Sequence, residues 1–318
     1  MRVDSDCFLV TGSDGCLGSW VVKNLVERGA RCIALDLDPQ ALRLRELLGE
    51  ERVGEVAFVA GDVAAQGLLE AVVETHAVTR IVHLAALQIP LVAADPTRGA
   101  HVNVVGTVRV FDAARAYHDQ VRSVVYASSA AVFGTGGRPG TLYGVFKVCN
   151  EETARVFWDD FGVASAGVRP WALYGYGRDQ RLTAAPTHAM KAAVLGVPYR
   201  IPFGGRLDLQ YADDVARTVV ELARLDNQGA EVYNLRGSVV SVGDVVAVIE
   251  RLRPESRGLL SHDEEPLPID PELDDAPLRS LLGAVPRRDF GAAVAETLDT
   301  FERLKARGQL SAADIPVA

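Results

Sequence analysis

The 318-residue sequence has little of three things that would indicate other classes of protein. It has four cysteines (Cys7, Cys16, Cys32 and Cys149) and no Cys-x-x-Cys pair, which argues against structural zinc or a disulfide framework and favours a reduced, cytoplasmic protein. It has no run of about 18 apolar residues, so we expect no membrane span. It has no excess of positive charge: 33 basic and 42 acidic residues give a formal net charge of −9, which disfavours nucleic-acid and anionic-membrane partners.

The remaining composition is that of an ordinary globular protein. Apolar residues make up 48% of the chain and charged residues 24%. The length fits roughly two domains. The first six residues carry two acids and lack the cationic start and apolar core of a signal peptide, so we expect no such peptide.

Short apolar runs alternate with amphipathic runs through the first half of the chain. We predict strands at Cys7–Thr11, Arg31–Asp36, Val56–Ala60, Arg80–Leu84, Val121–Ala127 and Val163–Val168. We predict helices at Leu17–Arg28, Pro39–Leu48 (with Pro39 as its first residue), Leu68–His76, Pro96–Tyr117 and Leu142–Phe161. Buried helix segments could also give apolar runs, but the short length and β-branched content of these runs favour strands. The alternation predicts an α/β fold with a doubly wound parallel sheet.

A glycine-rich loop joins the first predicted strand to the first helix. Gly12, Gly15 and Gly18 would permit a tight turn, close approach of a pyrophosphate and close helix packing. The helix that follows points its N–H groups and positive dipole end at the phosphates. Asp36 ends the second strand, where its carboxylate would bind both ribose hydroxyls and repel a 2′-phosphate. Spaced glycines alone can form an ordinary turn, but their flanking elements favour a dinucleotide site with NAD as cofactor.

The second half is broken by glycines and prolines, with an acidic loop over Pro254–Pro277 and a helix at Asp289–Arg307. We expect residues 1–170 to form an NAD-binding Rossmann-type domain, to which later segments at about 207–235 return. Residues 171–318 would form mainly a smaller C-terminal, substrate-binding lobe over the carboxyl edge of the sheet.

Tyr143 and Lys147 lie four residues apart, so they share one face of the predicted helix. A free tyrosine has a pKa near 10, so a base of this kind needs roughly 4 kcal/mol of stabilisation of the phenolate, which an ammonium and a positive nicotinamide ring could supply. Ser128 and Ser129 end the fifth strand, where one hydroxyl can bind the reacting oxygen. A tyrosine packed on an exposed helix is the alternative, but three agreeing placements favour a reaction site.

From Cys7 to about Phe301 the sequence resembles the extended short-chain dehydrogenases/reductases of the NAD-dependent epimerase/dehydratase group. The matching motifs are TGxxGxxG at 11–18, GDV at 61–63, HLAA at 83–86, VNVVGT at 102–107, SSAAVFG at 128–134, YGxxK at 143–147, RP at 169–170 and YADDVA at 211–216.

The resemblance implies a role for each matching residue. Tyr143 would be the acid/base, Lys147 would bind the nicotinamide ribose and lower the tyrosine pKa, and Ser129 would orient the substrate, with Ser128 as the near miss. The implied cofactor contacts are Gly12, Asp14, Gly15, Cys16, Leu17, Gly18, Asp36, Asp62, Val63, Leu84, Ala85, Ala86, Asn103, Ala127, Ser128, Tyr143, Lys147 and Pro170.

Some of these residues have structural alternatives. Asp62 and Val63 would flank the adenine, although Asp62 could instead be a turn acid. Asn103 would also steady the central strands. We assign His83 to the core. Asp213 and Asp214 open a predicted helix, where acids suit the dipole.

The residues implied for substrate binding are Ser129, Ala130, Tyr174, Arg178 and Arg206. The loop that contains Tyr174 and Arg178 fits a plain loop equally well.

Two departures from the family pattern limit the substrate prediction. Ala130 and Ala131 stand where sugar 4,6-dehydratases carry an Asp-Glu pair, so we predict no activity of that type. Leu207 stands where an arginine would clamp a substrate diphosphate, and Arg206 is one residue off, on the opposite face of a strand. Other arginines that could serve are Arg178, Arg181 and Arg200.

These observations predict an NAD-dependent oxidoreductase or epimerase that acts at a secondary hydroxyl of a carbohydrate-like, possibly nucleotide-sugar, substrate. One alternative is a dehydrogenase or reductase of a non-nucleotide carbonyl compound, such as a sugar acid or a secondary metabolite. Another is a catalytically silent NAD-binding protein. We expect a small-molecule substrate, no metal, and a homodimer paired through the helices Pro96–Tyr117 and Leu142–Phe161.

Overall fold

The computed structural model describes residues 6–315, so most of the acidic start that argues against a signal peptide lies outside the described residues. The chain forms two compact units. The first comprises the chain up to Pro170 together with Val215–Leu235 and Asp275–Val285, and the second comprises Trp171–Asp214, Arg236–Asp274 and the chain from Pro286 onward.

The first unit is built on seven parallel strands in the order β10-β6-β5-β4-β1-β2-β3. β1 pairs with β2 on one side and with β4 on the other, so the strand order reverses beside β1. Ligands of open α/β sheets bind at the carboxyl ends of the strands beside such a reversal. The predicted doubly wound parallel sheet is thereby confirmed. The strands are β1 (Cys7–Thr11), β2 (Arg31–Asp36), β3 (Ala57–Ala60), β4 (Arg80–His83), β5 (Ser123–Ala127), β6 (Ser165–Arg169) and β10 (Ala230–Asn234).

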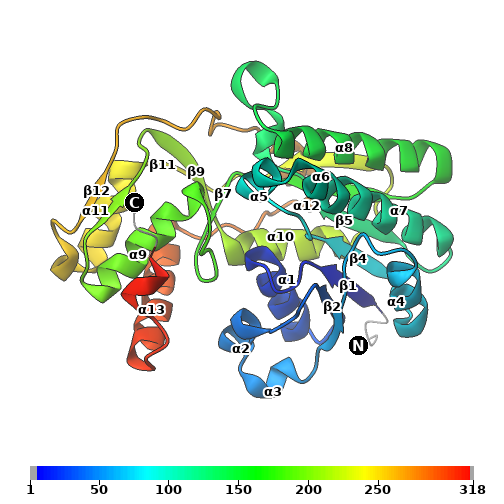
Figure 1. The fold of residues 1–318 in the computed structure, drawn as a ribbon, viewed down its shortest axis with the longest axis horizontal. Helices are drawn as coiled ribbons and strands as arrows, with labels where there is room; N and C mark the ends of the chain where they lie inside the picture. The colour runs from blue at the N-terminus through cyan, green and yellow to red at the C-terminus, as the bar shows by residue number, and fades with distance from the viewer. Residues whose placement is uncertain (1–5, 316–318) are drawn as a thin grey trace. The chain divides into compact units, whose positions relative to one another are not determined.

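Helices cover both faces of this sheet (Figure 1). On one face, α4 (Leu68–His76), α7 (Gly106–Ala116) and α8 (Leu142–Phe161) bury an apolar core that includes Leu9 and Phe111. On the other face, α1 (Cys16–Glu27) adjoins α10 (Ala212–Arg224), and Arg28 pairs with Glu221 at 2.6 Å. The remaining helices of this unit are α2 (Leu42–Leu48), α3 (Glu50–Val53), α5 (Ile89–Ala94), α6 (Pro96–Ala100) and α12 (Ala276–Leu282).

Two predicted helices differ from the observed ones by more than a one-residue shift of their ends. The helix expected from Pro39 begins at Leu42, because Ala41 has a left-handed φ of 55° that a helix cannot contain. The helix expected over Pro96–Tyr117 is interrupted by a π-helical turn at His101–Val105. The helix α5 was not predicted, since its six residues are too few to show a periodicity.

The second unit has its own sheet, in the order β11-β9-β7, and a parallel pair of β12 and β8. The return to the first unit was expected at about residue 207, but residues 207–214 stay in the second unit because β9 pairs with β7 and β11. The segment Asp275–Val285 joins the first unit instead. The elements are β7 (Ala172–Tyr174), α9 (Ala185–Leu195), β8 (Tyr199–Ile201), β9 (Arg206–Tyr211), β11 (Ser238–Ser241), α11 (Val242–Leu252), β12 (Leu260–His262) and α13 (Phe290–Ala306).

None of the helices within residues 6–315 is both long and apolar enough to cross a membrane. All four cysteines are free thiols. A reduced, cytoplasmic setting stays a prediction from the sequence.

Candidate active site

The loop after β1 is held by backbone contacts that only glycine permits. Gly12 has a φ of 70°, and a Cβ placed on it would lie 2.6 Å from the backbone N of Ala85. A Cβ on Gly18 would lie 2.1 Å from the Gly12 carbonyl oxygen. Gly15 is exposed at the start of α1, where no side chain caps the helix. The N–H groups at an accessible helix N-terminus without a side-chain cap fit a pyrophosphate, so this cradle suits the dinucleotide predicted from the sequence.

Asp36 is held beside the glycine loop by two backbone N–H groups. Its Oδ2 accepts from the N–H of Asp14 (2.9 Å) and its Oδ1 from the N–H of Leu37 (2.8 Å). A carboxylate oxygen has two acceptor sites, so both oxygens retain capacity for ribose hydroxyls. Arg43 donates to the backbone oxygen of Asp14 (2.8 Å), and burial raises the pKa of the Asp14 carboxyl. The carboxylate of Asp62 accepts from the N–H of Ala64 (2.9 Å), as in the turn-acid alternative.

A side chain of the π-helical turn, Asn103, holds the backbone of the segment that follows β4. The amide of Asn103 accepts from the N–H of Leu87 (2.7 Å) and donates to its carbonyl (2.6 Å). Asn150 of α8 donates to the carbonyl of Asn103 at 2.9 Å. His83 is buried between Thr11 (2.8 Å) and Thr107 (3.0 Å), and burial lowers its pKa to about 3, so it is a neutral core histidine.

Ser129 and Tyr143 lie where the N-terminus of α8 packs against the 3₁₀ turn that follows β5. Ser129 is partly exposed and caps a 3₁₀ turn over Ala130–Val132, with its Oγ accepting from the N–H of Ala131 (3.1 Å). A Cβ on Gly144 would lie 2.5 Å from the carbonyl oxygen of Ala131, so glycine is required for this approach. The ring of Tyr143 then packs in one cluster with Ala131.

Lys147 lies one turn of α8 beyond Tyr143. Its side chain is buried, with Nζ 5.5 Å from the centre of the Tyr143 ring and 2.5 Å from the carbonyl oxygen of Ala127. Burial lowers the pKa of Lys147 to about 8, and the nearby charge of Glu151 opposes that effect. The structure therefore brings the three residues predicted for the reaction to the carboxyl ends of the central strands.

Ser128 takes part in a charged network that was not predicted from the sequence. Its hydroxyl donates to Glu151, and Arg169 donates to the same carboxylate through Nε (2.8 Å) and Nη2 (2.6 Å). Arg169 also reaches Asn234 at the end of β10 (3.3 Å). Because the Ser128 hydroxyl is committed to Glu151, Ser129 is the serine available to a ligand. The spacing of Glu151, four residues after Lys147, was the signal that could have identified it.

The other predicted cofactor contacts surround the same edge of the sheet. Val63 is buried, and the carbonyl of Pro170 accepts from the N–H of Ala130 (2.9 Å). The residues at strand ends and in the first turn of α1 are Cys16, Leu17, Leu84, Ala85, Ala86 and Ala127.

Three of the predicted substrate contacts lie in the second unit. Tyr174 is 1% exposed and packs near the rings of Tyr211 and Phe290, which favours a packing role over substrate contact. Arg178 donates to Thr183 (2.8 Å). Arg206 is exposed and pairs with Glu272 (2.8 Å), whereas Leu207 is fully buried in the core of the unit.

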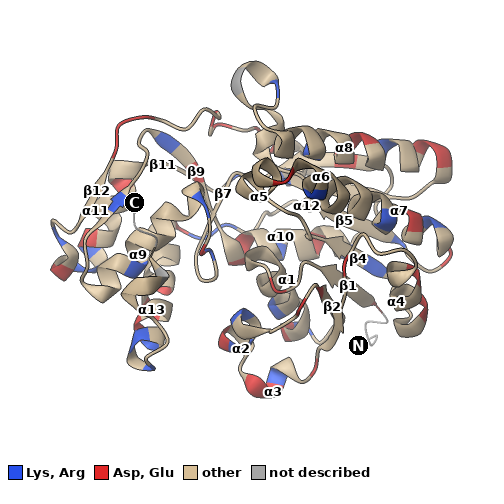
Figure 2. Ribbon diagram, viewed as in Figure 1, with Lys and Arg blue, Asp and Glu red and all other residues tan. Residues whose placement is uncertain are grey.

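Acidic side chains follow β12 in this unit, along residues 263–274 (Figure 2). Asp263 pairs with Arg200, and Glu272 pairs with Arg236 as well as Arg206. Three arginines of the unit are thus occupied by carboxylates of this segment.

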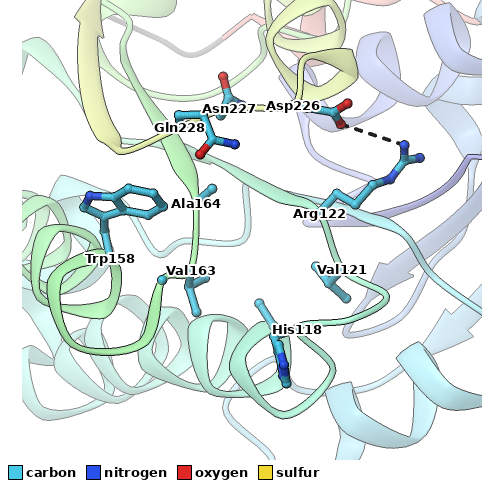
Figure 3. Close-up of a pocket in the computed structure, with 11 residues that line it drawn as sticks. His118, Val121, Arg122, Trp158, Val163, Ala164, Asp226, Asn227 and Gln228 are labelled. Carbon is cyan, nitrogen blue, oxygen red and sulfur yellow. Dashed lines mark ion pairs between the residues drawn. The ribbon is translucent and has the colours of Figure 1, made fainter.

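A hollow of about 240 Å³ opens at the opposite, amino-terminal edge of the first unit's sheet (Figure 3). Its wall includes His118 after α7, Trp158 on α8 and Arg122 before β5. Arg122 pairs with Asp226 (3.8 Å) and with Asp6. The predicted reaction residues lie at the other ends of the strands, so we assign no catalytic role to this hollow.

Residues 8–235 match the NAD dependent epimerase/dehydratase family. UDP-glucuronate 4-epimerase 3 of Arabidopsis thaliana is 29% identical over 279 residues, which cover 77% of this chain and 64% of that protein. UDP-glucose 4-epimerase of Mycolicibacterium smegmatis is 28% identical over 317 residues, which cover 92% of this chain and 97% of that protein. The chain spans less than two thirds of the length of the first Arabidopsis relatives it matches.

A solved structure of MoeE5 in complex with UDP-glucose and NAD is similar to the chain. It is 25% identical and superposes with a TM-score of 0.77, covering 93% of this chain and 99% of the other.

Proposed function

Because this chain belongs to the NAD-dependent epimerase/dehydratase family, we propose that it is an epimerase acting at a secondary hydroxyl of a nucleotide sugar. The family match confirms the predicted family and its cofactor, NAD. The observation that carries the proposal is the convergence of Ser129, Tyr143 and Lys147 at the carboxyl ends of the strands, beside a glycine cradle.

The residues of the first unit would hold NAD at its two ends. The glycine loop and the N-terminus of α1 would bind the pyrophosphate, and Asp36 would bind the adenosine ribose. Lys147 would bind the nicotinamide ribose. When bound, NAD supplies the carbon that accepts a hydride from the substrate.

The side chains of the protein would transfer the proton of the substrate hydroxyl and stabilise the phenolate that accepts it. The phenol oxygen of Tyr143 would take the proton of the substrate hydroxyl and later return it. The ammonium of Lys147 would favour the phenolate by its positive charge. The hydroxyl of Ser129 would donate to the reacting oxygen. Ala130 and Ala131 offer no group that transfers a proton, so we do not propose the elimination step of a 4,6-dehydratase.

The test is to incubate the full chain with NAD and either UDP-glucose or UDP-glucuronate, and to identify the epimer by proton NMR. We expect Tyr143→Phe to bind NAD while its turnover falls about 10³-fold, because the base is lost. Tyr117→Phe is the matched control, since Tyr117 follows the C-terminus of α7 and its exposed hydroxyl donates to Glu74 of α4. Normal turnover by Tyr143→Phe would refute the assignment.

A second candidate is a dehydrogenase or reductase of a non-nucleotide carbonyl compound. The burial of Leu207 and the pairing of Arg206 with Glu272 favour it, because neither side chain offers a free cation to a diphosphate. Calorimetry with UDP separates the two candidates: tight binding supports the nucleotide sugar. NAD binding without turnover of any sugar or carbonyl compound would instead support a catalytically silent protein.

We also propose that the chain forms a homodimer through the exposed face of α7 and α8. Apolar side chains lie on that face at Val108, Val145 and Val156, each more than a third exposed. Covering such side chains is a common reason for association. A sedimentation mass of one 34.1 kDa chain would contradict the proposal.

A further inference from the structure

Glu151 continues the catalytic face of α8. It lies four residues after Lys147 and eight after Tyr143, so the three side chains follow one another along one side of the helix. The Glu151 side chain is 12% exposed. A carboxylate with this little access to water needs partners that offset the loss of hydration.

Glu151 has those partners on two neighbouring strands. It accepts from the Ser128 hydroxyl, at the end of β5, and from two nitrogens of Arg169, at the end of β6. Ser128 directly follows Ala127, whose carbonyl oxygen lies 2.5 Å from the Nζ of Lys147. One carboxylate therefore joins α8 to the strand end that receives the lysine ammonium.

The carboxylate of Glu151 also affects the protonation of Lys147, because the other groups near the lysine are neutral or positive. His83 of β4 is neutral, since burial holds its pKa at about 3, and burial also keeps Tyr126 of β5 protonated by raising its pKa. Arg169 of β6 brings a second positive charge, which Glu151 pairs with directly. The negative charge of Glu151 opposes the deprotonation that burial favours at Lys147.

We propose that Glu151 is a positioning residue that keeps Lys147 protonated and fixes the end of β5 against α8. The proposal rests on the role proposed above for Lys147. Its test requires neither substrate nor NAD, so it can fail or succeed independently of the proposed function.

The experiment follows Lys147 directly by NMR of the full chain labelled with ¹³C at the lysine ε carbons. The chain has four lysines, Lys23, Lys147, Lys191 and Lys305, and Lys147→Met assigns its signal by removing it. In the wild type we expect a titration midpoint near pH 8. In Glu151→Gln the midpoint should fall by about one pH unit, because the opposing negative charge is gone.

Glu152→Gln is the matched control. Glu152 is the next residue on α8, but it is exposed and pairs with Arg155, so its loss should leave the midpoint unchanged. An unchanged midpoint in folded Glu151→Gln, with melting checked by circular dichroism, overturns the proposal.

Arg169→Gln provides a second test, which applies even if Glu151→Gln does not fold. It frees the carboxylate of its cationic partner, so the Lys147 midpoint should rise. A purely structural role would disturb the site alike in both variants. An unchanged or lowered midpoint in Arg169→Gln therefore overturns the proposal.

Discussion

At the scale of single residues, the role proposed for the ammonium of Lys147 conflicts with the stability of the folded chain. It is 4% exposed, and burial lowers its pKa to about 8. An unfolded lysine has a pKa near 10.4. Below pH 8 the folded chain therefore holds a buried charge that water would solvate better. Keeping a cation beside Tyr143 thus lowers the free energy of unfolding.

The linkage between protons and folding makes this cost measurable. Between pH 8 and about 10.4 the unfolded chain binds more protons at Lys147 than the folded chain, so stability rises with pH through that window. We expect Lys147→Met to be more stable than the wild type at pH 7, and this difference in the free energy of unfolding to shrink by up to about 3 kcal/mol as the pH approaches 10.4. Urea unfolding of both proteins at pH 7 and pH 10 measures it. A difference that does not vary with pH would show that Lys147 is not the group responsible.

At the scale of elements, the turn from β1 into α1 requires a residue without a Cβ at position 18. The Cβ position of Gly18 is occupied by the carbonyl oxygen of Gly12, at 2.1 Å. Any side chain there must push the first turn of the helix away from the loop.

We therefore expect Gly18→Ala to lower the free energy of unfolding by about 2 kcal/mol and to weaken NAD binding at least tenfold. Gly140→Ala is the control, because a Cβ there meets open space and its φ is not positive. Calorimetry with NAD and urea unfolding give both quantities. If the two variants behaved alike, the turn would not depend on this contact.

Sequence patterns predict the elements well where a long periodicity or strong boundary exists. The helices Leu68–His76 and Leu142–Phe161 and the strands Cys7–Thr11 and Arg31–Asp36 were predicted with their observed bounds. The start of α2 was missed because the left-handed conformation of Ala41 follows from the fold and not from residue type. The short strands of the second unit, such as β7 and β8, are three residues long, which is too few to establish a periodicity.

The residues of the candidate site likewise divide into those that local spacing predicts and those that only the fold brings together. Gly12, Asp36, Tyr143 and Lys147 stand in fixed local spacings that a sequence reveals. The spacing of Glu151 after Lys147 places it on the same face of the helix, but its pairing with Ser128 and Arg169 could not be predicted, because only the folded sheet brings these elements together.

At the scale of the whole molecule, the first unit is assembled from three separate stretches of chain, and Arg80 helps to join them. This buried side chain donates to Asp6 (2.8 Å), to the carbonyl oxygen of Leu225 (2.6 Å) and to Asp226 (2.7 Å). It thereby ties the stretch that contains β1 and β4 to the later stretch that contains β10.

We expect Arg80→Met to lower the free energy of unfolding by about 3 kcal/mol, since it leaves the buried Asp6 without this partner. Arg122→Met is the matched control. Arg122 pairs with the same two acids, but its side chain is 42% exposed, so its loss should cost about 1 kcal/mol or less. Denaturant unfolding of both variants measures these changes. Equal decreases in the free energy of unfolding would contradict a special role for Arg80.

The close approach of Gly12 to Ala85 has a practical consequence for protein engineering. The turns that follow β1 and β4 rest directly on each other's main chain, with no side chain between them to absorb a change. Anyone who transplants the first turn into another scaffold must carry residues 84–87 with it, together with the asparagine that clamps Leu87.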